Sequence, residues 1–345
     1  MAQIRVKLSA AQLITVVAFL IITVVLYLNS VGLPAKITDV HPLKYDGRRH
    51  RETLKRHRQP VKHSMKNCSV EKCTFEEVQR ERKLHAWRVC NTTEYRQTNN
   101  SYFARHRFDH MYYLNRTGIV FCTVPKAAST TLKKLMLASN ALDYNFVSIK
   151  NTHDVFDRHV IKLSKLLETE IMNILHNSTK IMIVRHPFTR LLSAFKDKLE
   201  PIWAESYFPR SDFILHIQTQ LGLEKSGRIT FSDFLRYLNL LDNEYHLDAQ
   251  EHWREIYKIC MPCEVKYDVI GKFEHLYDGE LESIYRLLNI SDVYIQPEHY
   301  TGASEKMVIK QYFSTLSKET LKRLYQRYRI DFALFSYRME AEKSV

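Results

Sequence analysis

From about Thr117 to the C-terminus, short apolar runs alternate with longer amphipathic stretches, which is typical of an α/β domain with a sheet flanked by helices. Three of the apolar runs predict buried strands: Ile119–Val124, Tyr144–Ile149 and Lys180–Val184. Apolar residues at helical spacing predict four helices, which begin near Thr130, after Pro187, after Thr230 and after Ser317. Ser317, and Thr230 with Asp233 three residues on, are residue types that cap helix N-termini.

The N-terminus carries a longer apolar segment than any of these runs. Residues 8–28 are 21 residues without a charge. At about 1.5 Å per residue a helix of that length spans about 30 Å, the thickness of a bilayer core. We therefore expect a transmembrane signal-anchor at residues 8–28, after a cytoplasmic tail at residues 1–7. A cleaved signal peptide is the alternative, because Arg5 and Lys7 form a charged region before it.

Charge separates the next part of the chain from the α/β domain. The formal net charge is +13, and residues 36–66 hold ten Lys and Arg against three Asp and Glu. This segment lacks helical or strand periodicity, so we expect residues 29–110 to form an exposed stem followed by an irregular, cysteine-bearing collar. The catalytic domain would then occupy residues 111–345. The basic excess favours a polyanionic partner, such as nucleic acid, an anionic membrane surface or an acidic glycan.

Cysteines and glycosylation sequons indicate the compartment. All six cysteines and all six sequons lie C-terminal to the apolar segment. This arrangement is typical of an oxidising lumen and predicts a type II membrane protein. The candidate glycosylation sites are Asn67, Asn91, Asn99, Asn115, Asn177 and Asn289. We expect disulfides of unknown pairing, with Cys122 as an unpaired core thiol as one alternative. A zinc site made by Cys260, Cys263, Cys68 and Cys73 is another.

The segment between the first strand and its helix carries a strong chemical signal. It reads Pro125-Lys-Ala-Ala-Ser-Thr-Thr131. A helix N-terminus presents unpaired N–H groups and a partial positive charge, so it binds phosphate, and Lys126 adds a full charge. The loop lacks the G-x-x-x-x-G-K-[ST] pattern, which argues against a nucleoside triphosphate with magnesium. An ordinary strand–helix junction capped by hydroxyl groups is the alternative.

A second segment repeats this architecture. Arg185 ends a predicted strand, Pro187 suits a first helical turn, and an amphipathic helix follows. Arg185 can bind a phosphate through two parallel hydrogen bonds, and Ser193 can donate another. Ligands of open α/β sheets bind beyond the carboxyl ends of the strands. We therefore expect both loops to bind one ligand that carries phosphate at two places.

These segments resemble the Golgi carbohydrate sulfotransferases, particularly the branch that makes chondroitin 4-sulfate, dermatan 4-sulfate and the HNK-1 epitope. The first loop resembles that family's 5′-phosphosulfate loop, and residues 185–193 are similar to its 3′-phosphate motif R-x-P-F-x-R-L-x-S. The resemblance covers about residues 117–337. Further similar stretches are His252-Trp253, Cys260-Met-Pro-Cys263, Tyr267–Glu274, Tyr312-Phe313, Leu324-Tyr325, Tyr328, Asp331-Phe332 and Leu334-Phe335.

The resemblance implies a P-loop-like sulfotransferase fold, with PAPS (3′-phosphoadenylyl sulfate) as the donor and no metal. The acceptor would be an acidic glycosaminoglycan or glycoprotein glycan, with the 4-O position of N-acetylgalactosamine in chondroitin or dermatan preferred. Uronyl 2-O- and HNK-1-type sulfotransferases are the alternatives. It implies that the donor is held by Pro125, Lys126, Ala127, Ala128, Ser129, Thr130, Thr131, Arg185, His186, Pro187, Phe188, Thr189, Arg190, Leu191, Leu192 and Ser193.

Sulfuryl transfer resembles phosphoryl transfer, with charge developing on the leaving oxygen. We expect Lys126 and the loop N–H groups to stabilise that oxygen. The resemblance places a histidine general base between the two motifs, which makes His153 the candidate and His159 the reserve. A Golgi membrane location with a lumenal catalytic domain follows, without a nucleic-acid partner. The sequence does not distinguish a monomer from a homodimer.

Two other classes of protein fit parts of this pattern. A membrane-anchored glycan-binding protein would keep the basic surface without needing Lys126, Arg185 and Ser193 together. A nucleotide kinase would need a glycine-rich loop and metal-binding carboxylates at the first loop. The basic clusters Lys133-Lys134 and Arg323-Arg327-Arg329 form either solvated faces or a groove for an acidic glycan.

Overall fold

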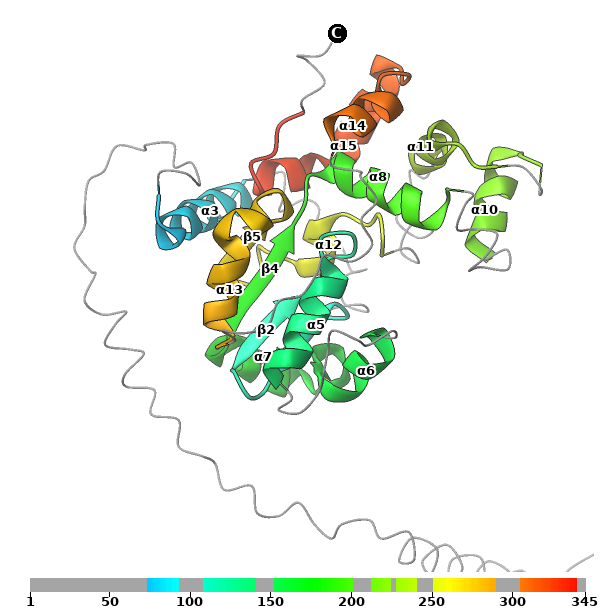
Figure 1. The fold of residues 1–345 in the computed structure, drawn as a ribbon. Coiled ribbons are helices and arrows are strands. Elements are labelled where there is room, and N and C mark those ends of the chain that lie inside the picture. The colour runs from blue at the N-terminus through cyan, green and yellow to red at the C-terminus, as the bar shows by residue number, and fades with distance from the viewer. Residues whose placement is uncertain are drawn as a thin grey trace, which may run out of the picture. The chain divides into compact units, whose positions relative to one another are not determined.

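A computed structural model describes residues 73–92, 108–140, 152–200, 212–224, 228–240, 251–289 and 305–339 (Figure 1). The chain divides into two units, Met1–Lys66 and Asn67–Val345, and the described residues all belong to the second. Several expected features lie outside the described residues: the anchor at residues 8–28, the basic stem up to residue 66, and the sequons at Asn67 and Asn99. Within the described ranges, no helix has the length and apolar character needed to cross a membrane.

A five-stranded sheet in the order β3-β1-β2-β4-β5 forms the centre of the second unit. The strands are β1 (Met111–Leu114), β2 (Ile119–Cys122), β3 (Ile161–Lys162), β4 (Thr179–Val184) and β5 (Val269–Lys272). Strands β2, β4 and β5 are parallel, which confirms the parallel sheet for this part. Strand β1 is antiparallel to both β2 and β3. Only a short turn that ends at Gly118, with φ of 68°, connects β1 to β2, and a connection this short joins antiparallel strands.

Helices follow or flank these strands. They are α3 (Phe75–Cys90), α5 (Ser129–Asn140), α6 (Thr152–His159), α7 (Glu168–Asn177), α8 (Pro187–Lys198), α10 (Asp212–Leu221), α11 (Phe231–Leu240), α12 (Ile256–Cys260), α13 (Leu281–Leu287), α14 (Lys306–Phe313) and α15 (Lys318–Leu334). The four predicted helices are confirmed as α5, α8, α11 and α15. Their predicted caps form as well: Thr230 Oγ1 accepts from Asp233 N at 3.1 Å, and Ser317 Oγ accepts from Thr320 N at 3.1 Å.

Alternate residues of the buried strands face opposite layers. Ile119 and Phe121 belong to a core cluster with α5, α6 and α13, whereas Val120 and Cys122 belong to one with α3, α7, α12 and α15. This is the period of two expected of a strand buried on both faces. A third cluster joins α8, α10, α11, α14 and α15 (Figure 1).

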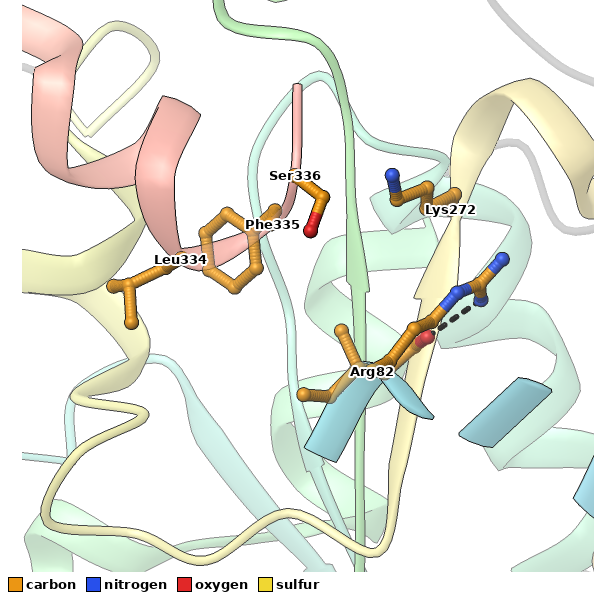
Figure 2. A pocket seen from close by; sticks show the side chains of 6 residues that line it. Arg82, Lys272, Leu334, Phe335 and Ser336 are labelled. Atoms are coloured by element: carbon orange, nitrogen blue, oxygen red, sulfur yellow. Dashed lines mark hydrogen bonds between the residues drawn. The ribbon is translucent and has the colours of Figure 1, made fainter. Parts of the chain in front are cut away.

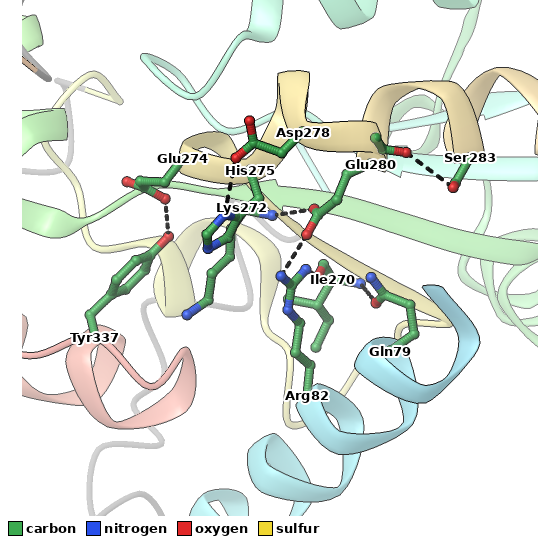
Figure 3. Close-up of polar contacts among 11 residues, drawn as sticks. Gln79, Arg82, Ile270, Lys272, Glu274, His275, Asp278, Glu280, Ser283 and Tyr337 are labelled. Atoms are coloured by element: carbon green, nitrogen blue, oxygen red, sulfur yellow. Dashed lines mark hydrogen bonds and ion pairs between the residues drawn. The ribbon is translucent and has the colours of Figure 1, made fainter. Parts of the chain in front are cut away.

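The collar is not wholly irregular, because α3 covers the edge strand β5. Arg82 Nη1 donates to Ile270 O at 2.7 Å (Figure 2), and Gln79 Oε1 accepts from Ile270 N at 2.8 Å (Figure 3). Arg82 also pairs with Glu280 at 2.5 Å. These side chains satisfy backbone groups that an edge strand would otherwise leave unpaired. Residues before position 111 therefore complete the sheet.

Two disulfides tie distant parts of the second unit together. Cys122 in β2 pairs with Cys260 in α12, and Cys90 at the end of α3 pairs with Cys263. The alternative of Cys122 as an unpaired core thiol is therefore wrong, and so is a zinc site that uses Cys260 and Cys263. Each bond closes a loop of more than a hundred residues. In the chain-entropy description, closing a loop of this length stabilises the fold by about 5 kcal/mol for each bond.

Four of the candidate glycosylation sites lie in described residues. Asn91, Asn115, Asn177 and Asn289 all have exposed side chains. Each is therefore accessible to modification.

Gly271 gives a test of the packing at the centre of the sheet. It pairs with Ile183 across β4 and β5, and a Cβ added there would overlap Ile183 Cδ1. We expect Gly271→Ala to lower the free energy of unfolding by about 1–3 kcal/mol, as overpacking does. Denaturant titration of Gly271→Ala, Ile183→Val and the double variant checks this. Ile183→Val removes Cδ1, so the double variant should be more stable than the sum of the single effects predicts; strict additivity would contradict the proposed overlap.

Candidate donor-binding site

The two predicted anion loops lie at the same edge of the sheet. Strands β2 and β4 are parallel neighbours, with Cys122 opposite Met182, so both end at their carboxyl edge. The segment from Pro125 leads into α5, and Arg185 leads into α8. This is the edge at which ligands of open α/β sheets bind.

The backbone of the first loop is left-handed at two positions that are not glycine. Lys126 and Ala128 have φ of 66° and 59°, and Ala127 between them, whose φ is not positive, donates its N–H to Val124 O at 3.1 Å. Left-handed conformations cost energy for residues other than glycine and concentrate at functional sites. Alternation of left- and right-handed residues turns successive N–H groups into a concave, anion-binding arrangement.

Lys126 is held by a carboxylate that the sequence reasoning missed. Its Nζ lies 3.2 Å from Asp197 Oδ2 in α8, and Lys198 Nζ lies 3.1 Å from the same oxygen. Burial lowers the pKa of Lys126, opposed by Asp197. Burial also disfavours the charged form of Asp197, but the two lysines outweigh it and hold its pKa below the ordinary value. Lys126 and Lys198 share the single carboxylate of Asp197, so these three side chains together carry a net positive charge.

Arg185 contacts the first loop directly. Its Nη1 donates to Lys126 O at 2.8 Å, and its guanidinium lies 4.2 Å from the ring centroid of Phe273. Burial lowers the pKa of Arg185 to about 10, which still leaves the group charged at neutral pH. The cation at the end of β4 is thus fixed against the loop that follows β2.

Arg190, one of the residues expected to hold the donor, binds main-chain carbonyls. Its Nε donates to Pro125 O at 2.8 Å, its Nη1 to Arg254 O at 2.6 Å and its Nη2 to Glu251 O at 3.1 Å. All three nitrogens are therefore engaged with main-chain carbonyls, and the side chain is fully buried. Arg190 therefore joins three segments of the site through three of its five N–H groups.

The other residues of the second motif divide between capping and core packing. His186 is the N-cap of α8: its Nδ1 accepts from Phe188 N at 3.2 Å, and its own N–H donates to Glu274 Oε1 at 2.8 Å. Pro187 occupies the first turn, and Thr189 Oγ1 donates to His186 O at 3.1 Å. Several side chains of this block pack in the third core cluster or lie buried in α8: Phe188, Leu191, Leu192 and Ser193.

The hydroxyl residues of the first loop form the first turn of α5. Ser129 and Thr130 are partly exposed there, whereas Thr131 is buried. The first N–H groups of an α-helix have no partner within the helix. Ser129 and Thr130 therefore remain in position to donate to a bound anion.

The two predicted bases lie in α6. His153 has its backbone in this helix, and its side chain lies outside what the structure describes. His159 is exposed at the other end, where its carbonyl accepts from Asn140 Nδ2 at 2.9 Å. Asn140 ends α5, about 17 Å along the helix from its start at the loop. This places His159 far from Lys126.

A third cation follows the third parallel strand. Lys272 ends β5, and its Nζ lies 4.4 Å from the ring centroid of Tyr337. Burial, and then the nearby Arg82, lower its pKa to about 8. The cavity beside it has a volume of about 10 Å³, room for one water but not for a nucleotide (Figure 2).

The two basic clusters differ in their exposure to solvent. Lys133 and Lys134 are buried, and Lys133 Nζ lies 5.1 Å from the ring centroid of Phe156. Arg327 is partly buried and donates to Leu238 O at 2.8 Å, whereas Arg323 is exposed beside Glu319. The solvated-face interpretation fits Arg323 but is wrong for the two lysines. In the described ranges, no group of three or more His, Cys, Asp or Glu residues is arranged to hold a metal ion.

The fold and site define an α/β protein with two basic loops at the carboxyl edge of its sheet, and comparison with known proteins identifies its family. The sequence model described as "Sulfotransferase family" matches residues 109–338, so the chain belongs to the sulfotransferase family. It is 32% identical over 266 residues to "Carbohydrate sulfotransferase 10" of Gallus gallus, covering 73% of each chain. It is 29% identical over 293 residues to "Carbohydrate sulfotransferase 12" of Xenopus laevis, covering 76% of this chain and 69% of that one. No solved structure matches.

Proposed function

We propose that this protein is a carbohydrate sulfotransferase that transfers a sulfuryl group from PAPS to a glycan hydroxyl. The 4-O position of N-acetylgalactosamine in chondroitin or dermatan is the first acceptor to test. The relatives named carbohydrate sulfotransferase support a carbohydrate acceptor. They do not separate the chondroitin, uronyl 2-O and HNK-1 types.

The observation that carries the proposal is the contact between the two loops. Arg185 Nη1 lies 2.8 Å from Lys126 O, and Arg190 Nε lies 2.8 Å from Pro125 O. The cations after β2 and β4 are therefore close enough to bind one small ligand that carries anionic groups at two places. PAPS has such groups in its 5′-phosphosulfate and 3′-phosphate.

The residues of the site suit the charge changes of this reaction. Lys126 and the N–H groups at the start of α5 would neutralise the charge that develops on the bridging oxygen. Arg185, with Ser193, would hold the 3′-phosphate and so orient the nucleotide. Asp197 would release Lys126 from its ion pair as the donor's anion approaches, because both compete for the same ammonium group.

The disulfides support a location in an oxidising lumen. Cys122–Cys260 lies within the catalytic domain and Cys90–Cys263 joins the collar to it, and such bonds form and persist in the secretory pathway rather than the cytosol. The four exposed sequon asparagines agree with this location. We propose a single-pass type II protein of the Golgi membrane with a lumenal catalytic domain.

Binding to adenosine 3′,5′-bisphosphate, the nucleotide product, tests the donor assignment. We expect the full-length protein to bind it without added metal, and with higher affinity than it binds ATP, which lacks the 3′-phosphate. Labelled PAPS with chondroitin, desulfated dermatan, heparosan and glucuronate-terminated glycans, followed by disaccharide analysis, would then identify the acceptor position. Equal affinity for ATP, or no binding, would contradict the proposal.

A further inference from the structure

A tight turn at Glu251–Arg254 is joined to both anion loops by Arg190. Arg190 holds its two ends through Glu251 O and Arg254 O, and the same guanidinium holds Pro125 O, next to Lys126. Within the turn, Trp253 is buried, and its carbonyl accepts from Tyr328 Oη at 2.6 Å. His252 is therefore fixed beside the first loop by contacts on both sides of it.

The imidazole of His252 has an unused hydrogen-bonding atom in this position. Its Nδ1 is buried and has no hydrogen-bond partner among the described residues. A buried polar atom without a partner costs free energy, and such atoms recur where a ligand or catalytic function supplies the missing contact. The neighbouring His110 differs, because its Nε2 lies 3.4 Å from Glu251 Oε2.

We propose that His252 is the general base that accepts the proton of the acceptor hydroxyl, in place of the His153 expected from the family resemblance. This inference rests on the proposed sulfotransferase function. Arg190 joins the turn that carries His252 to Pro125, next to Lys126, the residue proposed to meet the bridging oxygen of the donor, and the charge of Lys126 acts on the imidazole.

The proposed step conserves atoms and charge. The acceptor oxygen forms a bond to sulfur while its proton passes to an imidazole nitrogen of His252. The bond between sulfur and the bridging oxygen breaks, and its electron pair stays on the 5′-phosphate of the departing adenosine 3′,5′-bisphosphate, next to Lys126. The products are the sulfated glycan, the nucleotide and a protonated His252, which then loses its proton to solvent.

The electrostatic surroundings keep the ring neutral until the donor arrives. Burial first, and then the charges of Lys198 and Lys126, lower the pKa of His252 to about 3. Asp197 acts in the opposite direction, and Arg190 in the same direction as the lysines. A bound anion would neutralise the lysines and so raise the pKa of the imidazole. His252 would thus become an effective base only with the donor in place.

Paired substitutions in the full-length protein test the role in turnover. We expect His252→Gln to lower kcat by about 10²–10⁴-fold with little change in affinity for adenosine 3′,5′-bisphosphate, since a base acts on the acceptor. His153→Gln should stay within a few-fold of the wild type, as should His176→Gln, an exposed control in α7. Added imidazole should restore part of the activity of His252→Ala, which a purely structural role would not allow.

Nucleotide binding gives a readout that needs no acceptor. If the bound anion raises the pKa of His252, the wild type takes up a proton on binding and His252→Gln does not. The ratio of the two dissociation constants for adenosine 3′,5′-bisphosphate, variant over wild type, should therefore grow as the pH falls from about 8 to about 5.5.

Three results would overturn the assignment of His252: a flat ratio, a kcat for His252→Gln near that of the wild type, or a loss of kcat no larger than the loss of nucleotide affinity. A wild type that binds no adenosine 3′,5′-bisphosphate would instead overturn the sulfotransferase proposal, and this role for His252 with it.

Discussion

Lys126→Met is expected to lower kcat for sulfuryl transfer by about 10²–10³-fold, the loss that follows removal of one donor to a developing oxyanion. Methionine keeps the length and apolar body of the side chain but removes the charge. The charge on the bridging oxygen is largest in the transition state, so affinity for adenosine 3′,5′-bisphosphate should fall much less than kcat. Kinetics with labelled PAPS and equilibrium binding of the nucleotide measure the two effects separately.

Lys322→Met is the matched control, because Lys322 is an exposed lysine of α15. It should leave both quantities unchanged. If Lys126→Met and Lys322→Met had the same kcat, Lys126 would have no part in the chemistry. The ion pair with Asp197 would then be its main role.

Arg190→Met is expected to have the largest effect on stability of any single substitution in the site. It leaves three main-chain carbonyls, those of Pro125, Glu251 and Arg254, without their charged donor. A hydrogen bond to a charged group contributes about 1.5–3 kcal/mol, and a domain has about 5–15 kcal/mol in total. Much of the variant should therefore fail to fold, with a low yield and a strongly lowered Tm in any folded fraction.

The control for this variant is Arg323→Met, because Arg323 is an exposed arginine whose partner Glu319 lies one helical turn away. Exposed pairs of this kind contribute about 0.3–0.5 kcal/mol, so its Tm should barely change. Similar stability of the two variants would mean that Arg190 does not join the three segments as described.

Local pattern predicted the elements with a strong periodic signal. The runs at Ile119–Val124 and Lys180–Val184 correspond to β2 and β4, and the caps at Thr230 and Ser317 form as expected. The run at Tyr144–Ile149 lies outside the described residues. Strands β1, β3 and β5 were not predicted, because none of them lies in an apolar run as long as those predicted at β2 and β4. Only pairing with a neighbouring strand makes them strands.

The residues of the candidate site also divide into those that local sequence indicated and those that only the fold revealed. The sequence indicated Lys126 and Arg185, because each directly follows a strong apolar run. The family resemblance also included Arg190 among the donor-binding residues, and only the fold shows that its guanidinium holds three carbonyls. Asp197, and His252 as the proposed base, were not among the expected site residues: the first looks like a charged residue on a helix, and the second lies 67 residues after Arg185.

The sequence by itself determined the class of this protein: an α/β domain with two anion-binding loops that resemble those of sulfotransferases. Both loops are contiguous segments, so their residue types and spacing are visible before folding. Tertiary structure alone decided which charges share a carboxylate, which cysteines pair and which histidine lies beside Lys126. Those outcomes depend on segments separated by tens to hundreds of residues, and only burial in a common core brings such segments together.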